Sequence, residues 1–293
     1  MVVVRAPATS ANLGSGFDVF GVALDRPADV VRVEPAEETT IEVTGLGAQF
    51  IPTDPEKNTA GVVAEALDAP AHIQIDKGVR PSSGLGSSAA SAAGAAVALD
   101  ALYDGGRSAE ALVRAAAEGE AAVSGEAHAD NVAPAVMGGF TIVTDDGITA
   151  LDADLPLVAC LPETVVSTRK ARRVLPDSVG IDDLVDTVGA ASTLVAGMAR
   201  GDPGLVGRGM HDPIVTPARA ALIEGYDAVH EAAVDAGAAG VTVSGAGPTV
   251  LAVPEPGRSR AVASAMVDAF EDAGVEATAY QTRIGDGAVV YEG

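Results

Sequence analysis

The most informative feature of this sequence is a glycine-rich segment that leads directly into an alanine-rich stretch. The segment reads Pro81-Ser-Ser-Gly-Leu-Gly-Ser-Ser-Ala89, and the alanine-rich stretch continues to Leu102. Glycines let the backbone approach an anion, and the N–H groups at the start of a helix add about half a positive charge. The segment therefore predicts a phosphate-binding loop in front of a helix. The alternative is a plain glycine turn in which Ser87 caps that helix.

Two common nucleotide-binding fingerprints are absent from this loop. No lysine follows its glycines, so it is not a Walker A loop. Gly84-Leu-Gly86 is followed by serines and not by a third glycine, so it is not a dinucleotide-binding fingerprint either. The phosphate loop must belong to another class of protein.

Composition and charge limit the kinds of protein and partner that are possible. The chain has 293 residues, of which 48% are hydrophobic, and a mean hydropathy of +0.27, which excludes intrinsic disorder. Its 41 acidic and 18 basic residues give a net charge of −23. A surface this negative repels nucleic acid and anionic lipid, which excludes both as partners. Only three of the cations are lysines, which favours adaptation to a salt-rich cytosol; an ordinary acidic enzyme is the alternative.

Neither disulfides nor a structural metal are expected. Cys160 is the only cysteine, and the four histidines form no HxxxH or HxH pair. The N-terminus lacks the apolar region of a signal peptide, and the longest apolar stretch, Ala89 to Leu99, is too short to span a membrane. We therefore expect a cytoplasmic protein.

The order of predicted elements indicates an α+β chain. The first part carries short β-branched runs and then helices. Its predicted strands are 2–4, 19–24, 30–34, 40–43 and 136–144, and its helices are 87–102 and 109–123. An acidic stretch at 145–156 predicts a boundary between domains 1–153 and 154–293, or alternatively a hairpin within one domain. The second part suggests a ferredoxin-like half with strands 157–161, 240–243, 249–253 and 275–283 and helices 181–200, 216–236 and 258–273.

Two further glycine-rich segments, Pro7 to Asp18 and Val243 to Thr249, set the phosphate loop in a family context. The three segments resemble the GHMP kinase superfamily in order and spacing. Within it the chain is similar to the homoserine kinase family from Arg5 to about Val253. The more specific matches are His128-Ala-Asp-Asn-Val-Ala-Pro134, Ser167-Thr-Arg-Lys-Ala-Arg172 and Pro217-Ala-Arg219.

The resemblance implies a two-domain fold and a reaction. The N-terminal half would be like domain 2 of ribosomal protein S5, and the C-terminal half ferredoxin-like. The activity would be ATP-dependent phosphorylation of the L-homoserine hydroxyl to O-phospho-L-homoserine in threonine biosynthesis, with Mg²⁺. The resemblance leaves a homodimer open. Alternatives are a GHMP kinase of the shikimate or mevalonate type and a non-catalytic nucleotide-binding relative.

The resemblance also implies site residues. Ser88 and Glu120 would hold Mg²⁺ and, with Asn131, form the catalytic group. Asn12 and Asp18 would hold the amino end of homoserine, and Arg172 and Arg219 its carboxylate. His128, Asn131 and Thr168 would surround the hydroxyl and the γ-phosphate. The nucleotide would contact Asn58, Pro81, Ser82, Ser83, Gly84, Leu85, Gly86, Ser87, Ser88 and Ala89.

Asp130 leaves the mechanism open at this point. It follows His128 closely and has the right chemistry for a general base, as a comparable aspartate has in mevalonate kinases. The resemblance to homoserine kinases favours direct attack of the hydroxyl without such a base. Phosphoryl transfer mainly needs positioning and charge stabilisation, so a strong base is optional.

Overall fold

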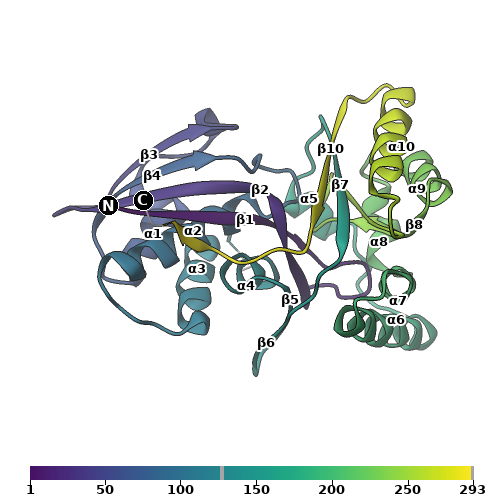
Figure 1. Cartoon of the computed structure of the whole chain (residues 1–293), viewed down its shortest axis with the longest axis horizontal. Coiled ribbons are helices and arrows are strands. Elements are labelled where there is room, and N and C mark those ends of the chain that lie inside the picture. Colours follow the sequence, from purple (N-terminus) through teal and green to yellow (C-terminus); the bar gives the residue numbers. More distant parts are fainter. Residues whose placement is uncertain (126–128, 292–293) are drawn as a thin grey trace.

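The computed structural model describes residues 1–125 and 129–291 and arranges them around two sheets (Figure 1). The first sheet has seven strands among these residues, in the order β11-β1-β2-β4-β3, with β5 beside β2 and β6 beside β5. Their bounds are β1 (Val2–Ala11), β2 (Phe20–Pro35), β3 (Thr40–Gly45), β4 (Ala71–Lys77), β5 (Phe140–Thr144), β6 (Gly147–Leu151) and β11 (Val289–Tyr291). The last strand therefore returns to the sheet in which the chain began.

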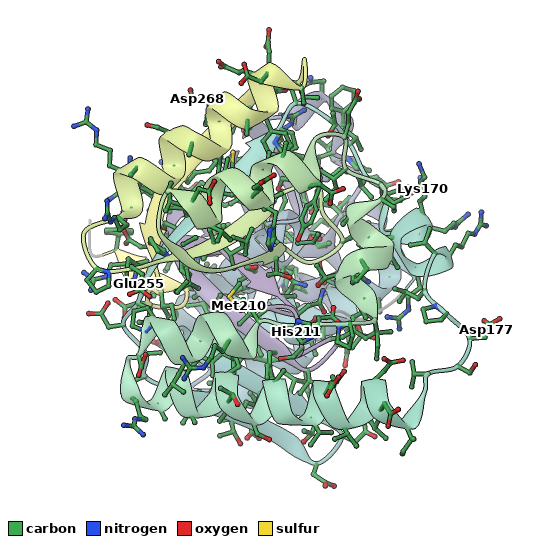
Figure 2. All side chains as sticks on the ribbon, turned by 90° about the vertical axis from the view of Figure 1, so that its right-hand side faces the viewer. Lys170, Asp177, Met210, His211, Glu255 and Asp268 are labelled. Atoms are coloured by element: carbon green, nitrogen blue, oxygen red, sulfur yellow. The ribbon has the colours of Figure 1, made fainter. Side chains whose placement is uncertain are left out.

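The second sheet has four antiparallel strands in the order β10-β7-β9-β8. They are β7 (Pro156–Pro162), β8 (Ala238–Val243), β9 (Val250–Pro254) and β10 (Ala277–Arg283). Figure 2 shows the molecule from the side of this second sheet. Helices lie above and below the sheet, with many carboxylate oxygens on their outer faces. The helices are α5 (Thr168–Arg173), α6 (Ile181–Arg200), α7 (Pro203–Gly209), α8 (Val215–Ala220), α9 (Tyr226–Asp235) and α10 (Ser259–Asp272).

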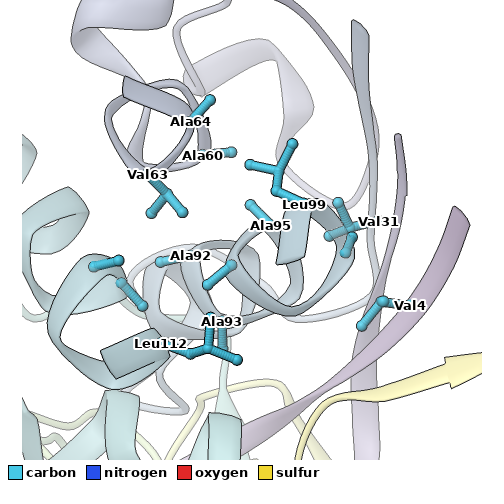
Figure 3. Packing of buried hydrophobic residues seen from close by; sticks show 14 of the residues in the cluster. Val4, Val31, Ala60, Val63, Ala64, Ala92, Ala93, Ala95, Leu99 and Leu112 are labelled. Atoms are coloured by element: carbon cyan, nitrogen blue, oxygen red, sulfur yellow. The ribbon is translucent and has the colours of Figure 1, made fainter. Parts of the chain in front are cut away.

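Small residues let helix α2 (Ser87–Leu102) lie at the centre of the first half, against the sheet. Figure 3 shows Ala92, Ala93 and Ala95 between neighbouring helices and the strands that carry Val4 and Val31. A Cβ on Gly94 would lie 2.6 Å from Val31, so only glycine permits this approach. The other helices of this half are α1 (Thr59–Ala66), α3 (Ala109–Ser124) and α4 (Ala129–Met137), with the 3₁₀ turns η1 (Ala48–Phe50) and η2 (Pro55–Lys57).

One buried cluster joins the two halves. Phe20 and Phe140 from the first sheet contact each other edge to face, with ring centroids 5.1 Å apart. Leu157 and Leu251 from the second sheet and Met198 from α6 belong to the same buried cluster. The strands and loops of the two halves therefore meet across shared apolar packing, which fixes the walls of any site between them.

The predicted α+β organisation is confirmed, and three local predictions need correction. Strands 19–24 and 30–34 are parts of one continuous strand, β2. Residues 136–137 end α4, which continues through Pro134, so the strand begins only at Phe140. The predicted helix 216–236 is broken into α8 and α9 because Gly225 adopts a left-handed φ of 83°.

The acidic stretch after β5 folds as a hairpin, in which Val143 pairs with Ile148 and Thr144 with Gly147. The hairpin alternative is thus confirmed for residues 145–151, while the boundary at 153/154 stays a prediction. Among the described residues, no helix combines the length and apolar character that crossing a membrane requires.

Candidate active site

A cavity of about 350 Å³ is bordered by all three glycine-rich segments. Its wall contains most of the residues to which the resemblance assigned a role: Asn12, Asp18, Asn58, Pro81, Ser82, Ser83, Gly84, Gly86, Ser87, Ser88, Glu120, Asn131, Thr168, Arg172 and Arg219. The side chains of Leu85 and Ala89 do not line it, because both are fully buried in apolar clusters. His128 lies outside the described residues.

The carbonyl groups of the phosphate loop are bound by the protein itself. Ser244 Oγ donates to the Gly84 carbonyl oxygen at 2.7 Å, and Thr249 Oγ1 donates to that of Ser83 at 2.7 Å. The Thr9 backbone N–H donates to the Leu85 carbonyl oxygen at 3.0 Å. Residues of the glycine-rich segments Pro7–Asp18 and Val243–Thr249 thereby bind three successive carbonyl oxygens. The partial negative charges of these oxygens are then not presented to an approaching phosphate.

The start of α2 is suited to bind an anion. Gly86 precedes the helix with a left-handed φ of 62°, and no side chain caps the first turn. Gly84 also has a positive φ, and a Cβ there would lie 2.7 Å from the Ser244 carbonyl oxygen. Backbone N–H groups at the start of a helix of 16 residues therefore lie at the wall of the cavity, next to two glycines.

Lys77 lies behind this helix start, and no sequence pattern pointed to it. Its ammonium is paired with Asp29 and donates to the Ser87 carbonyl oxygen at 2.7 Å and to Ser91 Oγ at 2.8 Å. Burial lowers the pKa of Lys77, and the neighbouring Asp29 carboxylate opposes that shift. The Asp29 carboxylate also accepts from the backbone N–H groups of Gly78 and Val79. The buried ion pair of Lys77 and Asp29 therefore holds the phosphate loop and the start of α2 in place.

Ser88 and Glu120 meet in the cavity wall. Ser88 is in the first turn of α2, and its hydroxyl donates to the carboxylate of Glu120 on α3. Glu120 is buried and lies next to the phosphate loop. A hydroxyl oxygen and one carboxylate, with room for phosphate oxygens and waters, are the ligands that Mg²⁺ prefers.

At the other side of the cavity, Asp18 and Arg172 form an ion pair of 2.5 Å, with both side chains less than half exposed. Asn12 holds Asp18 in place, since its Oδ1 accepts from the Asp18 backbone N–H at 3.0 Å and its Nδ2 donates to the Gly245 carbonyl oxygen at 3.1 Å. Asn12 therefore uses its amide to shape the site, while Asp18 and Arg172 present opposite charges to it.

Arg219 brings a second, more deeply buried cation to the same corner. It is 5% exposed and donates to the Gly245 carbonyl oxygen at 2.6 Å, while its buried Nε has no hydrogen-bond partner within the described residues. Burial lowers the pKa of Arg219; Asp18 opposes this shift and Arg172 adds to it. Both guanidinium groups lie over the ring of Phe17, 5.2 Å and 5.0 Å from its centroid. Two cations stacked on one aromatic ring form a binding corner for an anion.

Some of the remaining predicted residues line the cavity, and others hold neighbouring elements of the protein together. Asn131 accepts from Thr9 Oγ1 at 2.9 Å, which ties α4 to the first strand. Asn58 caps α1 through its Oδ1 and donates to the Pro52 carbonyl oxygen at 2.6 Å. Thr168 begins α5 on the cavity wall, and Asp130 is buried in the wall on α4. Cys160 is buried in β7, where burial raises the pKa of its thiol to about 12.

Comparisons with known proteins decide the family. Residues 57–139 match the N terminal domain of GHMP kinases, and residues 194–272 match their C terminal domain. The chain is 70% identical to homoserine kinase of Halorubrum lacusprofundi, over 100% of both chains. It is 68% identical to homoserine kinase of Natronomonas pharaonis, over 99% of this chain and 100% of that one. This chain belongs to the homoserine kinase family.

The structural comparison agrees with this membership. The crystal structure of homoserine kinase from Cytophaga hutchinsonii superposes with a TM-score of 0.90 at 36% identity, over 99% of this chain and 97% of that chain. The expected two-domain GHMP kinase fold is thereby confirmed. As kinases, members of the homoserine kinase family use ATP as the phosphoryl donor.

Proposed function

We propose that this chain transfers the γ-phosphoryl group of ATP to the hydroxyl of L-homoserine, forming O-phospho-L-homoserine and ADP. The observation that carries the proposal is one cavity with an anchored phosphate loop on one side and opposed charges on the other. Homoserine carries an ammonium and a carboxylate on the same carbon, so it needs both signs of charge within a few ångströms. The relatives' name, homoserine kinase, is consistent with this substrate.

The ion pair between Asp18 and Arg172 supplies a way to bind such a zwitterion. The ammonium of homoserine would pair with Asp18, and its carboxylate with Arg172 and the buried Arg219. One ion pair within the protein is exchanged for two with the ligand, and Arg219 gains the anion that its desolvated charge lacks. The substrate hydroxyl would then extend toward the phosphate loop.

The donor set also fits a magnesium ion. Ser88 and Glu120 would supply one hydroxyl and one carboxylate oxygen, and the ion would neutralise charge on the phosphates of ATP. The backbone N–H groups at the start of α2 would bind the same phosphates. These groups stabilise charge where it develops during transfer.

The reaction itself forms one bond and breaks one. The hydroxyl oxygen of homoserine attacks the γ-phosphorus, the bond between that phosphorus and the β-γ bridging oxygen breaks, and ADP leaves. The hydroxyl proton passes to an oxygen of the transferred phosphoryl group as the new ester forms. Because the transition state of phosphoryl transfer is loose, the main requirement is to position the substrate. Asn131, Thr168 and the charged side chains of Asp18, Arg172 and Arg219 would do so. Asp130, buried in the same wall, is the alternative acceptor for that proton.

A substrate panel tests the proposal. ADP formation is measured in molar KCl with homoserine, homoserine amide, mevalonate and shikimate. We expect efficient turnover with homoserine and at least tenfold lower kcat/KM with the amide, which keeps the hydroxyl and loses the carboxylate charge. Equal turnover of the amide, or a preference for mevalonate or shikimate, would refute the substrate assignment. No turnover with any of them would favour the non-catalytic alternative.

A further inference from the structure

The ring of Phe17 contacts both arginines of the cavity wall, and the proposed reaction gives it no role. The guanidinium carbons of Arg172 and Arg219 lie 5.2 Å and 5.0 Å from its centroid, within the range in which an aromatic face attracts a cation. Phe17 is not among the residues that line the cavity, whereas both arginines are. The ring can therefore act on a bound ligand only through these two side chains.

Aromatic side chains are scarce in this chain, and the other phenylalanines have different surroundings. Aromatic residues make up 3% of the chain, and five of them are phenylalanines. Phe20, Phe140 and Phe270 are buried in apolar clusters, and Phe50 is 79% exposed. Within the described residues, both contacts between a cation and an aromatic face are made by Phe17. Two cations on one ring are thus a specific feature of this site and not a consequence of composition.

The backbone on either side of Phe17 is held by hydrogen bonds. The Gly16 N–H donates to the Asn12 carbonyl oxygen at 2.9 Å, and the Asp18 N–H donates to Asn12 Oδ1 at 3.0 Å. A Cβ on Gly16 would overlap the ring of Phe20, so the loop packs closely on itself. The ring of Phe17 therefore has a fixed place, and the arginines reach it from other parts of the chain.

Arg172 and Arg219 repel each other, and little else in the corner holds them together. They come from separate helices, α5 and α8. Burial lowers the pKa of Arg219, and the charge of Arg172 lowers it further. The side chain of Arg172 is 45% exposed, so repulsion favours its rotation into solvent. A ring that attracts both cations opposes that rotation.

The ring also suits this task better than an acid would. A carboxylate at position 17 would attract both guanidinium groups, but it would neutralise charge that an anionic ligand needs. The face of Phe17 attracts cations through its quadrupole and carries no net charge. Both arginines therefore keep their full charge for the ligand.

We propose that Phe17 is the positioning residue of the carboxylate site, whose ring keeps Arg172 and Arg219 within reach of one carboxylate. The inference rests on the proposed function, because it takes homoserine as the ligand. When the ammonium of homoserine pairs with Asp18, the ion pair between Asp18 and Arg172 is given up. The ring then keeps Arg172 beside Arg219. Two long side chains that are ordered in advance lose less entropy when the carboxylate binds.

Fluorination of the ring tests this role at nearly constant shape. Fluorine withdraws electron density from the face of the ring and so weakens its attraction for cations. Phenylalanines with one, two and three ring fluorines are placed at position 17 by stop-codon suppression, and kinetics are measured in molar KCl. The KM for homoserine should rise with each fluorine, to about tenfold for three. The kcat and the KM for ATP should stay within about twofold, because the contact serves ground state and transition state alike.

The matched control is the trifluorinated ring at Phe270, which is fully buried in the second half and contacts no cation within the described residues. It should leave the KM for homoserine unchanged. Phe17→Leu keeps apolar bulk and removes the aromatic face. It should lower kcat/KM for homoserine about tenfold and leave that for homoserine amide within about twofold, since the amide lacks the carboxylate.

Two kinds of failure can be told apart. If the unmodified chain turns over homoserine but its KM stays constant across the fluorinated series, the role of Phe17 is refuted and the proposed function stands. The same holds if Phe17→Leu loses equal activity with homoserine and with the amide, since that marks a merely structural role. If the unmodified chain does not turn over homoserine, the proposed function and the role of Phe17 are both refuted. The fluorinated series decides alone should Phe17→Leu fail to fold.

Discussion

Arg219 is the residue whose environment says most about the substrate. Its guanidinium is almost fully buried, lies near a second cation on the ring of Phe17, and donates to a backbone carbonyl. Burial is the main reason why its pKa is lowered, so the charged form is held there at a cost. A bound carboxylate would offset that cost. Sequence alone indicated an arginine clamp by resemblance, but not the ring on which both arginines stack.

Replacing Arg219 should therefore affect homoserine and not ATP. Arg219→Leu is expected to lower kcat/KM for homoserine by roughly 30-fold to several thousand-fold, because a buried charge contact of about 2 to 5 kcal/mol is lost. The affinity for ATP, measured by titration calorimetry, should stay within about twofold, since the phosphate loop is unchanged. Arg260→Leu, an exposed arginine on α10, serves as the control. Parallel losses for both substrates would contradict a role in carboxylate recognition.

Glu120 allows a similar test of the proposed metal site. Glu120→Gln keeps the shape of the side chain and removes its charge. Turnover should fall by a factor of roughly 10² or more, which corresponds to about 2.7 kcal/mol of electrostatic stabilisation. Glu118→Gln, on the exposed side of the same helix, should leave turnover unchanged. Normal turnover of Glu120→Gln at saturating Mg²⁺ would remove Glu120 from the site.

At the scale of elements, prediction succeeded where local chemistry decides the structure. Ser87 begins α2 and Ser108 caps α3 through the Ala111 N–H, as the sequence indicates. It failed where packing overrides local preference. Pro134 lies inside α4, although proline usually ends a helix, and the apolar run after it therefore looked like a strand. Strand β11 is too short to be recognised before its pairing with β1 is known.

The same distinction holds for the elements that build the site. The glycine pattern predicted the phosphate loop, because glycines and a helix start act locally. The anchoring of that loop by Lys77 and Ser244 depends on contacts between residues far apart in sequence, so no local pattern could reveal it. Resemblance supplied Arg172 and Asp18 as separate contacts, and the structure adds that they are paired with each other.

A pair of glycine substitutions tests the loop as an element. Gly84 and Gly257 both have positive φ, of 82° and 78°, so alanine should strain the backbone similarly, by about 1 kcal/mol. A Cβ on Gly84 would also lie 2.7 Å from the Ser244 carbonyl oxygen, whereas Gly257 has open space. Gly84→Ala should thus lose at least tenfold in ATP affinity and Gly257→Ala none. Equal ATP affinity in both variants would contradict the proposed role of the loop.

At the scale of the whole molecule, charge dominates. The net charge of −23 acts over about 30 Å at 0.01 M ionic strength, which spans most of a domain, but over only about 3 Å at 1 M. Seven of the described cations form ion pairs with acids, so most carboxylates repel one another across the surface. High salt is expected to stabilise such a fold, in line with the halophilic archaea in which close relatives occur.

Thermal unfolding in a KCl series checks this expectation. The Tm should rise steadily between 0.1 and 2 M KCl as repulsion between carboxylates is screened. Sodium perchlorate at the same ionic strength separates screening from salting-out, because only screening is shared by the two salts. A Tm that stays flat or falls over this range in KCl would show that repulsion does not limit the stability of the fold.

Identification of the product tests the proposed reaction most directly. Purified chain is incubated with ATP, Mg²⁺ and L-homoserine in molar KCl, and the reaction is followed by phosphorus NMR. We expect a phosphomonoester resonance of O-phospho-L-homoserine that grows in equal amount with ADP and is absent without homoserine. Inorganic phosphate as the only new species besides ADP, or a phosphomonoester that forms equally well from mevalonate, would contradict the proposed reaction.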